Sequence, residues 1–470
     1  MMILKKFKEK YSINLKYLLV VTPTFVIVIN FLYSFYENNI FLKLEMSFIL
    51  KIISTLLLIG FLRQVGKMVS FLFELENISL SIVVFLLSFF VVDNIFLFFT
   101  KEISFNFHIL IISIFWILLA LYKKFTIQKL VVLLLNYFVL ILFNNLYYPR
   151  LINKVSSQST DITEFWEPTM KNILNNNYFY ALENNLIEGY GLLVSYIQAT
   201  VNIFSMGKII VGYEQTSPSL YIYFLLFILF LLELKISNLS KLIAVSTTIS
   251  IILNSTWLRF LFVESLMGEA VVSLIFTIFV YNVSINKINQ HSPILYLIFG
   301  SLFLSKQFII MISIFIVLAE FIFKKNKQIL IFSPFLYFIN KVYNQYFFEN
   351  QNGLSYLDNN SIYDLFDYYF IQNNLMLNNI FEILKIISID RVFVFFIFIL
   401  FLSYVVNFKE KPFRDYLTLS ILSNILLVIL LYISYWQNIE IESAYRYILN
   451  LMYIFILKYV LIIDNLLNKN

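Results

Sequence analysis

The chain has 470 residues, of which 60% are hydrophobic and 13% are charged, and its formal net charge is +6. Soluble domains average about 45–50% apolar and about 25% charged residues, so this composition excludes an ordinary soluble protein. There is no cysteine, which excludes disulfides, thiol catalysis and zinc–thiolate sites. The basic residues stand at the ends of apolar runs rather than along one face, so no nucleic-acid partner is predicted.

Apolar runs of roughly 20 residues, the length that crosses a bilayer as a helix, follow one another along the chain. They predict an all-α polytopic membrane protein with about 12–14 transmembrane helices surrounded by membrane lipids. The first run is too long for a cleaved signal peptide. We place the spans near residues 17–36, 46–62, 78–99, 106–122, 130–147, 218–234, 242–257, 262–283, 293–304, 307–323, 328–341, from Arg391 to Lys409, and 415–436, with a last span after Arg446.

The positive charges of short loops indicate which ends of the spans lie inside, because cytoplasmic loops retain Lys and Arg. The lysines at 5, 6, 8 and 10 place the N-terminus in the cytoplasm, and alternation of the spans returns the C-terminus there. Two long polar intervals then become external. The predicted regions are a five-span segment 1–147, a first external loop 148–217, a central transmembrane segment 218–341, a second external loop 342–390 and a three-span segment 391–470.

One stretch of the first external loop is apolar but interrupted by polar residues. Between residues 190 and 206, Ser195, Gln198 and Asn202 recur at helical spacing. This pattern predicts an amphipathic helix lying at the outer membrane surface, with a further transmembrane span as the alternative.

The same topology brings charged residues from distant segments to the outer face. They are Asp161, Glu164, Glu264, Lys306, Glu442 and Arg446. Charged residues at or just inside a hydrophobic boundary cost free energy, so they are retained for a pair, a pathway or a site. A carboxylate can act as a general base, and Lys or Arg can hold phosphate oxygens. Together they suit transfer of a group from a lipid phosphate, with ordinary solvated loop carboxylates as the alternative. The two histidines, His108 and His291, are interpreted as ordinary helix and loop positions.

In the first external loop, Asp161 is followed by Trp166, Pro168 and Lys171. This spacing resembles the first external loop of the GT-C superfamily of multispanning glycosyltransferases, in particular bacterial proteins related to protein O-mannosyltransferases and to families 39 and 83. Ile162 and Phe165 depart from its pattern, as does the absence of prolines around Tyr190. Further matching stretches are Glu188-Gly-Tyr190, Glu264 to Gly268, Lys306 between two short spans, and Glu442 to Arg446.

The resemblance implies a GT-C-like fold in the bacterial inner membrane and a role for each matching residue. Asp161 would be the base that activates the acceptor, and Glu164 or Glu264 would orient the acceptor or the sugar. Lys306 and Arg446 would hold the lipid phosphate. Trp166 would stack on a sugar or anchor the loop at the interface. The other residues assigned to sugar or acceptor binding are Lys171, Tyr190 and Glu442.

The implied partners are a polyprenyl-phosphate-linked sugar as donor and a glycan, lipid or protein as acceptor. No cofactor is predicted: Asp161 and Glu164 could offer oxygen ligands to a divalent metal, but no third carboxylate accompanies them. One alternative is an O-antigen-type polysaccharide polymerase or ligase, which residues 342–390 disfavour because they hold no arginine. The other is a non-enzymatic transporter of lipid-linked glycans, a class in which internal repeats are common.

Overall fold

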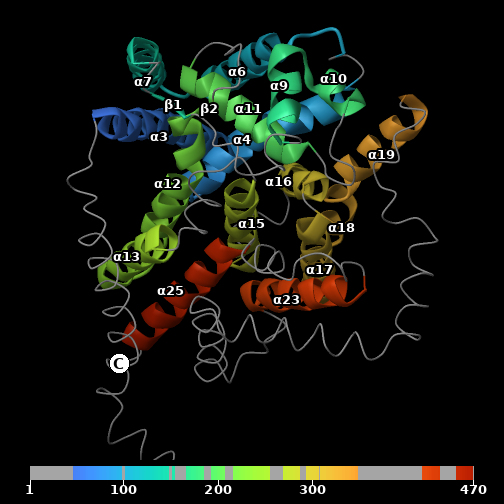
Figure 1. Ribbon diagram of the computed structural model, residues 1–470. Helices are drawn as coiled ribbons and strands as arrows, with labels where there is room; N and C mark the ends of the chain where they lie inside the picture. The colour runs from blue at the N-terminus through green and yellow to red at the C-terminus, as the bar shows by residue number, and fades with distance from the viewer. Residues whose placement is uncertain are drawn as a thin grey trace, which may run out of the picture.

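The computed structural model describes residues 46–97, 101–147, 151–153, 166–184, 192–206, 215–254, 268–285, 293–305, 307–347, 415–434 and 451–468. Within these ranges the regular elements are helices apart from one pair of two-residue strands (Figure 1). The prediction of an all-α protein is therefore confirmed. The predicted spans near 17–36 and from Arg391 to Lys409 and most of the second external loop lie outside the described residues.

In the part of the chain that the structure describes, four helices are long and apolar enough to cross a membrane. They are α3 (Met46–Phe73), α4 (Ile78–Ile95), α6 (Phe105–Tyr122) and α7 (Ile127–Leu146). On α6 and α7 most outward side chains are large and apolar, among them Phe115, Leu118, Leu135 and Phe138. Such a continuous exposed apolar surface suits contact with lipid, so the structure supports a membrane protein.

The helix α3 is longer than the span predicted at 46–62. It continues past Arg63 and Lys67 to Phe73, and both charged side chains are exposed on its surface. Arg and Lys favour the helical conformation, so the charges that mark the end of the apolar run do not end the helix.

The remaining predicted spans that fall in the described ranges are also helices. They are α12 (Ser217–Glu233), α13 (Asn238–Asn254), α15 (Glu269–Ser284), α16 (Pro293–Gly300) with the 3₁₀ turn η4 (Ser301–Leu304), α17 (Gln307–Lys324), α23 (Tyr416–Ser434) and α25 (Met452–Asn468). The single span predicted at 328–341 is wrong. The structure has two helices there, α18 (Lys327–Phe332) and α19 (Phe335–Phe347). Pro334 separates them, because proline has no backbone N–H to continue the hydrogen bonds of a helix.

The two ends of the interval predicted as the first external loop pair with each other. Strand β1 (Ile152–Asn153) pairs antiparallel with β2 (Gln215–Thr216), and Ile152 lies opposite Thr216. Between them the structure describes α9 (Glu167–Asn175), α10 (Tyr178–Glu183) and α11 (Leu193–Met206). The interval therefore leaves and rejoins the transmembrane helices at one place, between α7 and α12.

The prediction that 190–206 lies at the outer surface is wrong for the described part. Helix α11 contacts α4, α7, α9, α12 and α15, and its residues 193–205 are all buried. The polar side chains that suggested a water-facing side, such as Ser195 and Gln198, lie inside the protein. With 14 residues, the helix spans about 21 Å, which is shorter than the hydrocarbon core of a bilayer.

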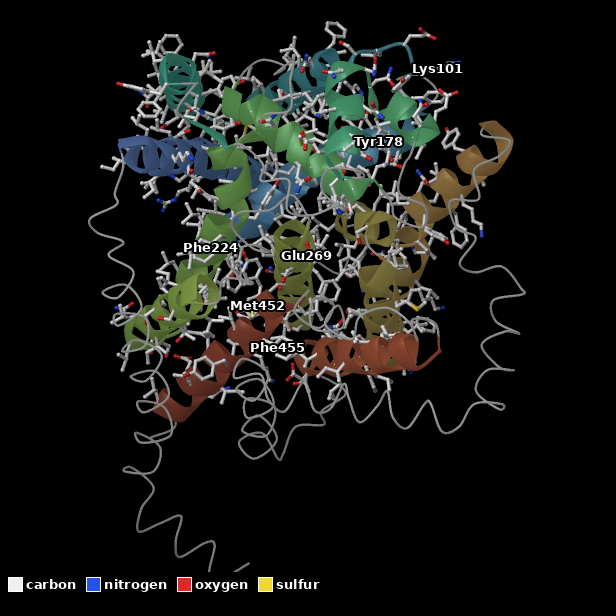
Figure 2. The ribbon with its side chains drawn as sticks, in the orientation of Figure 1. Lys101, Tyr178, Phe224, Glu269, Met452 and Phe455 are labelled. Atoms are coloured by element: carbon white, nitrogen blue, oxygen red, sulfur yellow. The ribbon has the colours of Figure 1, made fainter. Side chains whose placement is uncertain are left out.

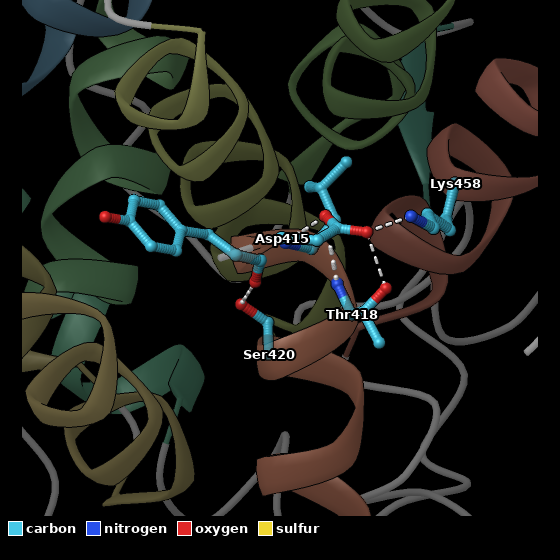
Figure 3. A network of polar contacts seen from close by, with 6 residues as sticks. Asp415, Thr418, Ser420 and Lys458 are labelled. Atoms are coloured by element: carbon cyan, nitrogen blue, oxygen red, sulfur yellow. Dashed lines mark hydrogen bonds and ion pairs between the residues drawn. The ribbon is translucent and has the colours of Figure 1, made fainter. Parts of the chain in front are cut away.

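Polar contacts join several helix ends that the sequence analysis predicts to be cytoplasmic. Ser79 donates to Glu233 at 2.9 Å, and Asn77 donates to Asn282 at 2.8 Å. At the start of α23, Asp415 accepts a hydrogen bond from Thr418 at 2.7 Å and forms an ion pair with Lys458 of α25 (Figure 3). These contacts fasten α4, α12, α15, α23 and α25 at one set of ends.

Candidate functional site

A buried carboxylate, Asp93, lies in the last turn of α4 and is bonded from two directions. His108, in the first turn of α6, pairs through Nδ1 with one carboxylate oxygen of Asp93. The hydroxyl of Tyr196, on α11, donates to the other oxygen. Asp93 is 1% exposed and His108 is 7% exposed. Three helices thus place an acid, an imidazole and a phenol in direct contact within the protein.

The next residue of α4, Asn94, extends the cluster toward two more helices. Its side-chain oxygen accepts a hydrogen bond from the hydroxyl of Tyr178 at 3.0 Å and another from Asn340 of α19 at 3.1 Å. Its amide nitrogen donates to the carbonyl of Phe90 at 2.8 Å. Asp93 and Asn94 are therefore the point at which α4, α6, α10, α11 and α19 meet.

Aromatic rings surround these polar groups and keep water away from them. The rings of Phe90 and Phe105 approach the ring of Tyr196 edge-on, with centroids 5.2 and 5.1 Å away. Tyr178 and Tyr196 also pack edge-on at 5.4 Å. This geometry is favourable for aromatic pairs. It leaves the Asp93 carboxylate in a medium of low polarity, where hydrogen bonds are electrostatically stronger than in water.

Local contacts hold the 101–105 turn and the loop helices around the cluster. Asn177 caps α10 by accepting from the backbone nitrogen of Tyr180 at 2.7 Å, and its amide donates to the carbonyl of Lys101 at 2.7 Å. The backbone nitrogen of Phe105 donates to Asn176 at 3.1 Å. Figure 2 shows Lys101 and Tyr178 in the same part of the molecule, away from Met452 and Phe455.

The two tyrosines of the cluster are held as neutral hydrogen-bond donors. Burial raises the pKa of Tyr196 well above the usual value, and the neighbouring Asp93 carboxylate raises it further. Burial likewise raises the pKa of Tyr178. Both phenols therefore keep their protons throughout the physiological range, as the bonds to Asp93 and Asn94 require.

Two of the site residues expected from the sequence are described. Trp166 is 4% exposed and immediately precedes α9, a burial that suits an anchor of the loop. Lys171 forms an ion pair with Glu167 one helical turn away at 3.0 Å. The other predicted site residues, Asp161, Glu164, Tyr190, Glu264, Lys306, Glu442 and Arg446, lie outside the described residues.

The segments that flank three of those predicted residues meet on α11. Helix α9 begins six residues after Asp161 and contacts α11. Gly268, four residues after Glu264, is so close to Val194 of α11 that a Cβ added there would lie 2.4 Å from its Cγ1. The turn η4 ends two residues before Lys306 and also contacts α11. Helix α11 is thus a shared support for segments far apart in the sequence.

Asp93 is not among the site residues predicted from the sequence, and His108 was interpreted as an ordinary helix position. The structure instead gives each a specific buried partner. A signal was available, since an ionisable residue inside a hydrophobic span is by default a candidate functional residue. Asp93 lies within the apolar run 78–99 and His108 within 106–122. Their pairing could not be predicted from the sequence, because it depends on how two helices cross.

Among the described residues, no three His, Cys, Asp or Glu side chains are grouped to hold a metal ion. Comparison of the chain with family models, curated proteins and solved structures found no match.

Proposed function

We propose that this protein is a membrane glycosyltransferase that moves a sugar from a polyprenyl-phosphate-linked donor to an acceptor at the external face of the membrane. One observation carries the proposal: α11 supports the three segments that flank Asp161, Glu264 and Lys306. These residues include the carboxylates and the cation that the resemblance to GT-C enzymes assigns to acceptor activation and phosphate binding.

The position of the buried cluster also suits such a donor. A polyprenyl chain lies in the bilayer and carries its sugar phosphate at the boundary with water, so the transferase must present polar groups beside apolar helices. Asp93 lies two residues before the end of α4, and His108 lies in the first turn of α6. Both helix ends are predicted to be external.

Each predicted residue has a defined part in this proposal. Asp161 removes the proton of the acceptor hydroxyl, while Glu164 or Glu264 orients the acceptor. Lys306 and Arg446 neutralise the phosphate as its bond to the sugar breaks, which is the transition-state role for which cations are suited. The remaining contacts to sugar or acceptor are assigned to Trp166, Lys171, Tyr190 and Glu442.

The second candidate function is a transporter of a lipid-linked glycan. The buried Asp93–His108 pair favours it, because acid–histidine chains within membrane helices are typical of proton relays in transporters. A transporter would move the donor across the membrane without breaking its sugar–phosphate bond.

The first test compares Asp161→Asn with the wild type for transfer of sugar from polyprenyl-phosphate donors in membranes. Asn keeps the size of the side chain and removes its capacity to accept a proton. Since a positioned general base contributes about 10²–10⁴-fold, the variant is expected to lose that much activity at an unchanged amount of inserted protein. Glu102→Gln, which removes an exposed carboxylate beside α6, serves as the control and should remain active.

Equal activity of Asp161→Asn and wild type would reject Asp161 as the base while leaving the enzyme class in place. Absence of transfer by the wild type with every donor tested, together with donor movement across vesicles, would favour the transporter.

A further inference from the structure

The turn between α6 and α7 is held in a fixed shape. Lys124 adopts a left-handed φ of 65°. Directly after it, the backbone nitrogen of Phe125 donates to the carbonyl of Ala120 at 2.9 Å, which closes α6 in the manner of a Schellman motif. Phe125 is buried, and its ring centroid lies 5.4 Å from that of Phe71. The turn is therefore anchored to α3.

A lysine occupies the left-handed position of this turn, where helices usually place a glycine. Glycine is preferred there because it has no Cβ to clash with the backbone. The side chain of Lys124 is exposed, and it forms no ion pair with any described residue. Contacts within the described fold therefore do not account for a lysine here. What the side chain adds is a positive charge at the end of two apolar helices.

Two further lysines lie close to Lys124 in the same turn. Lys123 and Lys129 are exposed, and Nζ of Lys129 lies over the ring of Phe125, 5.5 Å from its centroid. Neither lysine is paired with a carboxylate of the described part of the chain. The turn thus presents three positive charges that an anion would complement.

The surface next to these charges is apolar. Although a short turn joins them, α6 and α7 do not pack along each other: α7 packs against α3 and α11, and α6 against α3 and α9. Figure 1 shows α7 at the edge of the molecule. Apolar side chains near the turn stay exposed on both helices, among them Leu118 and Tyr122 on α6 and Ile127 and Val131 on α7. Such a surface suits hydrocarbon chains.

We propose that the α6–α7 turn binds an anionic phospholipid. Lys123, Lys124 and Lys129 hold the lipid phosphate, and the acyl chains lie against the exposed sides of α6 and α7. A phospholipid joins an anion to hydrocarbon and so complements both features, whereas a free phosphate complements the lysines alone. Lysine clusters at the ends of membrane helices attract the anionic lipids of the cytoplasmic leaflet, the side predicted for this turn. The inference does not depend on the proposed glycosyltransferase function.

The test measures binding of phosphatidylglycerol, which is anionic, to the full chain purified in a non-ionic detergent. Native mass spectrometry counts the lipids retained as phosphatidylglycerol is titrated, and phosphatidylcholine, which has no net charge, is the comparison. The test variant is the triple change Lys123→Gln, Lys124→Gln, Lys129→Gln. We expect its binding to weaken about fivefold for each lysine removed.

The matched control removes the same number of charges from other exposed turns predicted to be cytoplasmic. It is the triple change Lys235→Gln, Lys325→Gln, Lys327→Gln. Because the change in net charge is equal, the control separates a local site from a general attraction between a basic protein and an anionic lipid. It should bind phosphatidylglycerol as wild type does.

A single change separates lipid binding from folding. Lys124→Gly removes one charge and suits the left-handed φ, so its thermal unfolding midpoint without lipid should be no lower than that of wild type. The rise in the midpoint on adding phosphatidylglycerol should nevertheless be smaller. A residue that served only the fold would not give this combination.

Several results would overturn the inference. They are equal binding of phosphatidylglycerol by wild type and the test variant, an equal loss in the control variant, and equal binding of the two lipids by wild type. If inorganic phosphate raises the unfolding midpoint as much as phosphatidylglycerol does, and the test variant loses that effect, the site takes free phosphate and the assignment to a lipid is wrong.

Discussion

At the scale of single residues, the neighbours Asp93 and Asn94 divide the polar contacts of the site between them. Successive helical positions point about 100° apart, so Asp93 reaches His108 and Tyr196 while Asn94 reaches Tyr178 and Asn340. The charged residue contacts an imidazole and a phenol, and the neutral residue contacts a phenol and an amide. Two adjacent residues thereby join α6, α10, α11 and α19 to the end of α4.

The raised pKa values of Tyr178 and Tyr196 predict that the folded protein loses stability at alkaline pH. Their pKa values are raised above 10.0 in the folded protein, so their stabilising contribution is complete below about pH 10. It is lost as the pH rises from there toward the folded values, because the unfolded chain then releases protons that the folded chain retains. Thermal unfolding in detergent should show stability falling above about pH 10.

The double variant Tyr178→Phe, Tyr196→Phe should be less stable than wild type at neutral pH. Above about pH 10, it should lose less stability than wild type does. Tyr122→Phe, at a side chain that is 82% exposed, is the control. A double variant with the same alkaline slope as wild type would contradict the assignment.

At the scale of elements, the close packing of α15 against α11 depends on a glycine. Gly268 caps the start of α15 with a φ of 82°, in the left-handed region that glycine adopts readily and other residues do not. Its neighbour Glu269 is buried in the first turn of α15, and Figure 2 shows it near the centre of the molecule. A side chain at position 268 would push α15 away from Val194.

Gly268→Ala is therefore expected to destabilise the protein. The left-handed φ costs about 1–2 kcal/mol, and the overlap with Val194 adds about 1–3 kcal/mol. The measurement is the thermal unfolding midpoint in detergent. Adding Val194→Ala should recover the packing part of the loss and leave the backbone part. The matched control is Gly60→Ala within α3, where an added Cβ meets only Asn136 at 4.0 Å. It should be neutral or stabilising, because Ala favours a helix by about 1 kcal/mol over Gly.

At the scale of the whole molecule, the polar contacts agree with the predicted alternation of the spans. Helix ends predicted to be external meet around Asp93, Asn94 and Asn144. Helix ends predicted to be cytoplasmic meet around Glu233, Asp415 and Asp464. Each of these contacts joins ends assigned to the same side, although the assignment came from loop charges alone.

The absolute orientation can be tested with single cysteines, since the chain has none of its own. Glu102→Cys lies in an exposed turn predicted to be external, and Lys123→Cys lies in an exposed turn predicted to be cytoplasmic. A membrane-impermeant maleimide should label the first on intact cells and the second only after permeabilisation. The reverse pattern would place the site on the cytoplasmic side and exclude an external transfer reaction.

The sequence by itself determined the membrane class and the position of most helices. The run predicted at 106–122 is α6 at Phe105–Tyr122, and that predicted at 307–323 is α17 at Gln307–Lys324. Hydropathy and turn residues act on neighbours along the chain, so these features are local and can be recognised from one sequence. The break at Pro334 is local as well and follows from the missing backbone N–H of proline.

Only the tertiary structure decided which polar residues meet. Tyr196 and Asp93 are 103 positions apart, and Asn340 and Asn94 are 246 apart. The same limit explains the wrong prediction for α11, whose polar side chains have the spacing of a water-facing helix but lie among other helices. Periodicity reports that a helix has a polar side. What that side faces is decided by the packing of distant segments, because burial is a property of the assembled fold.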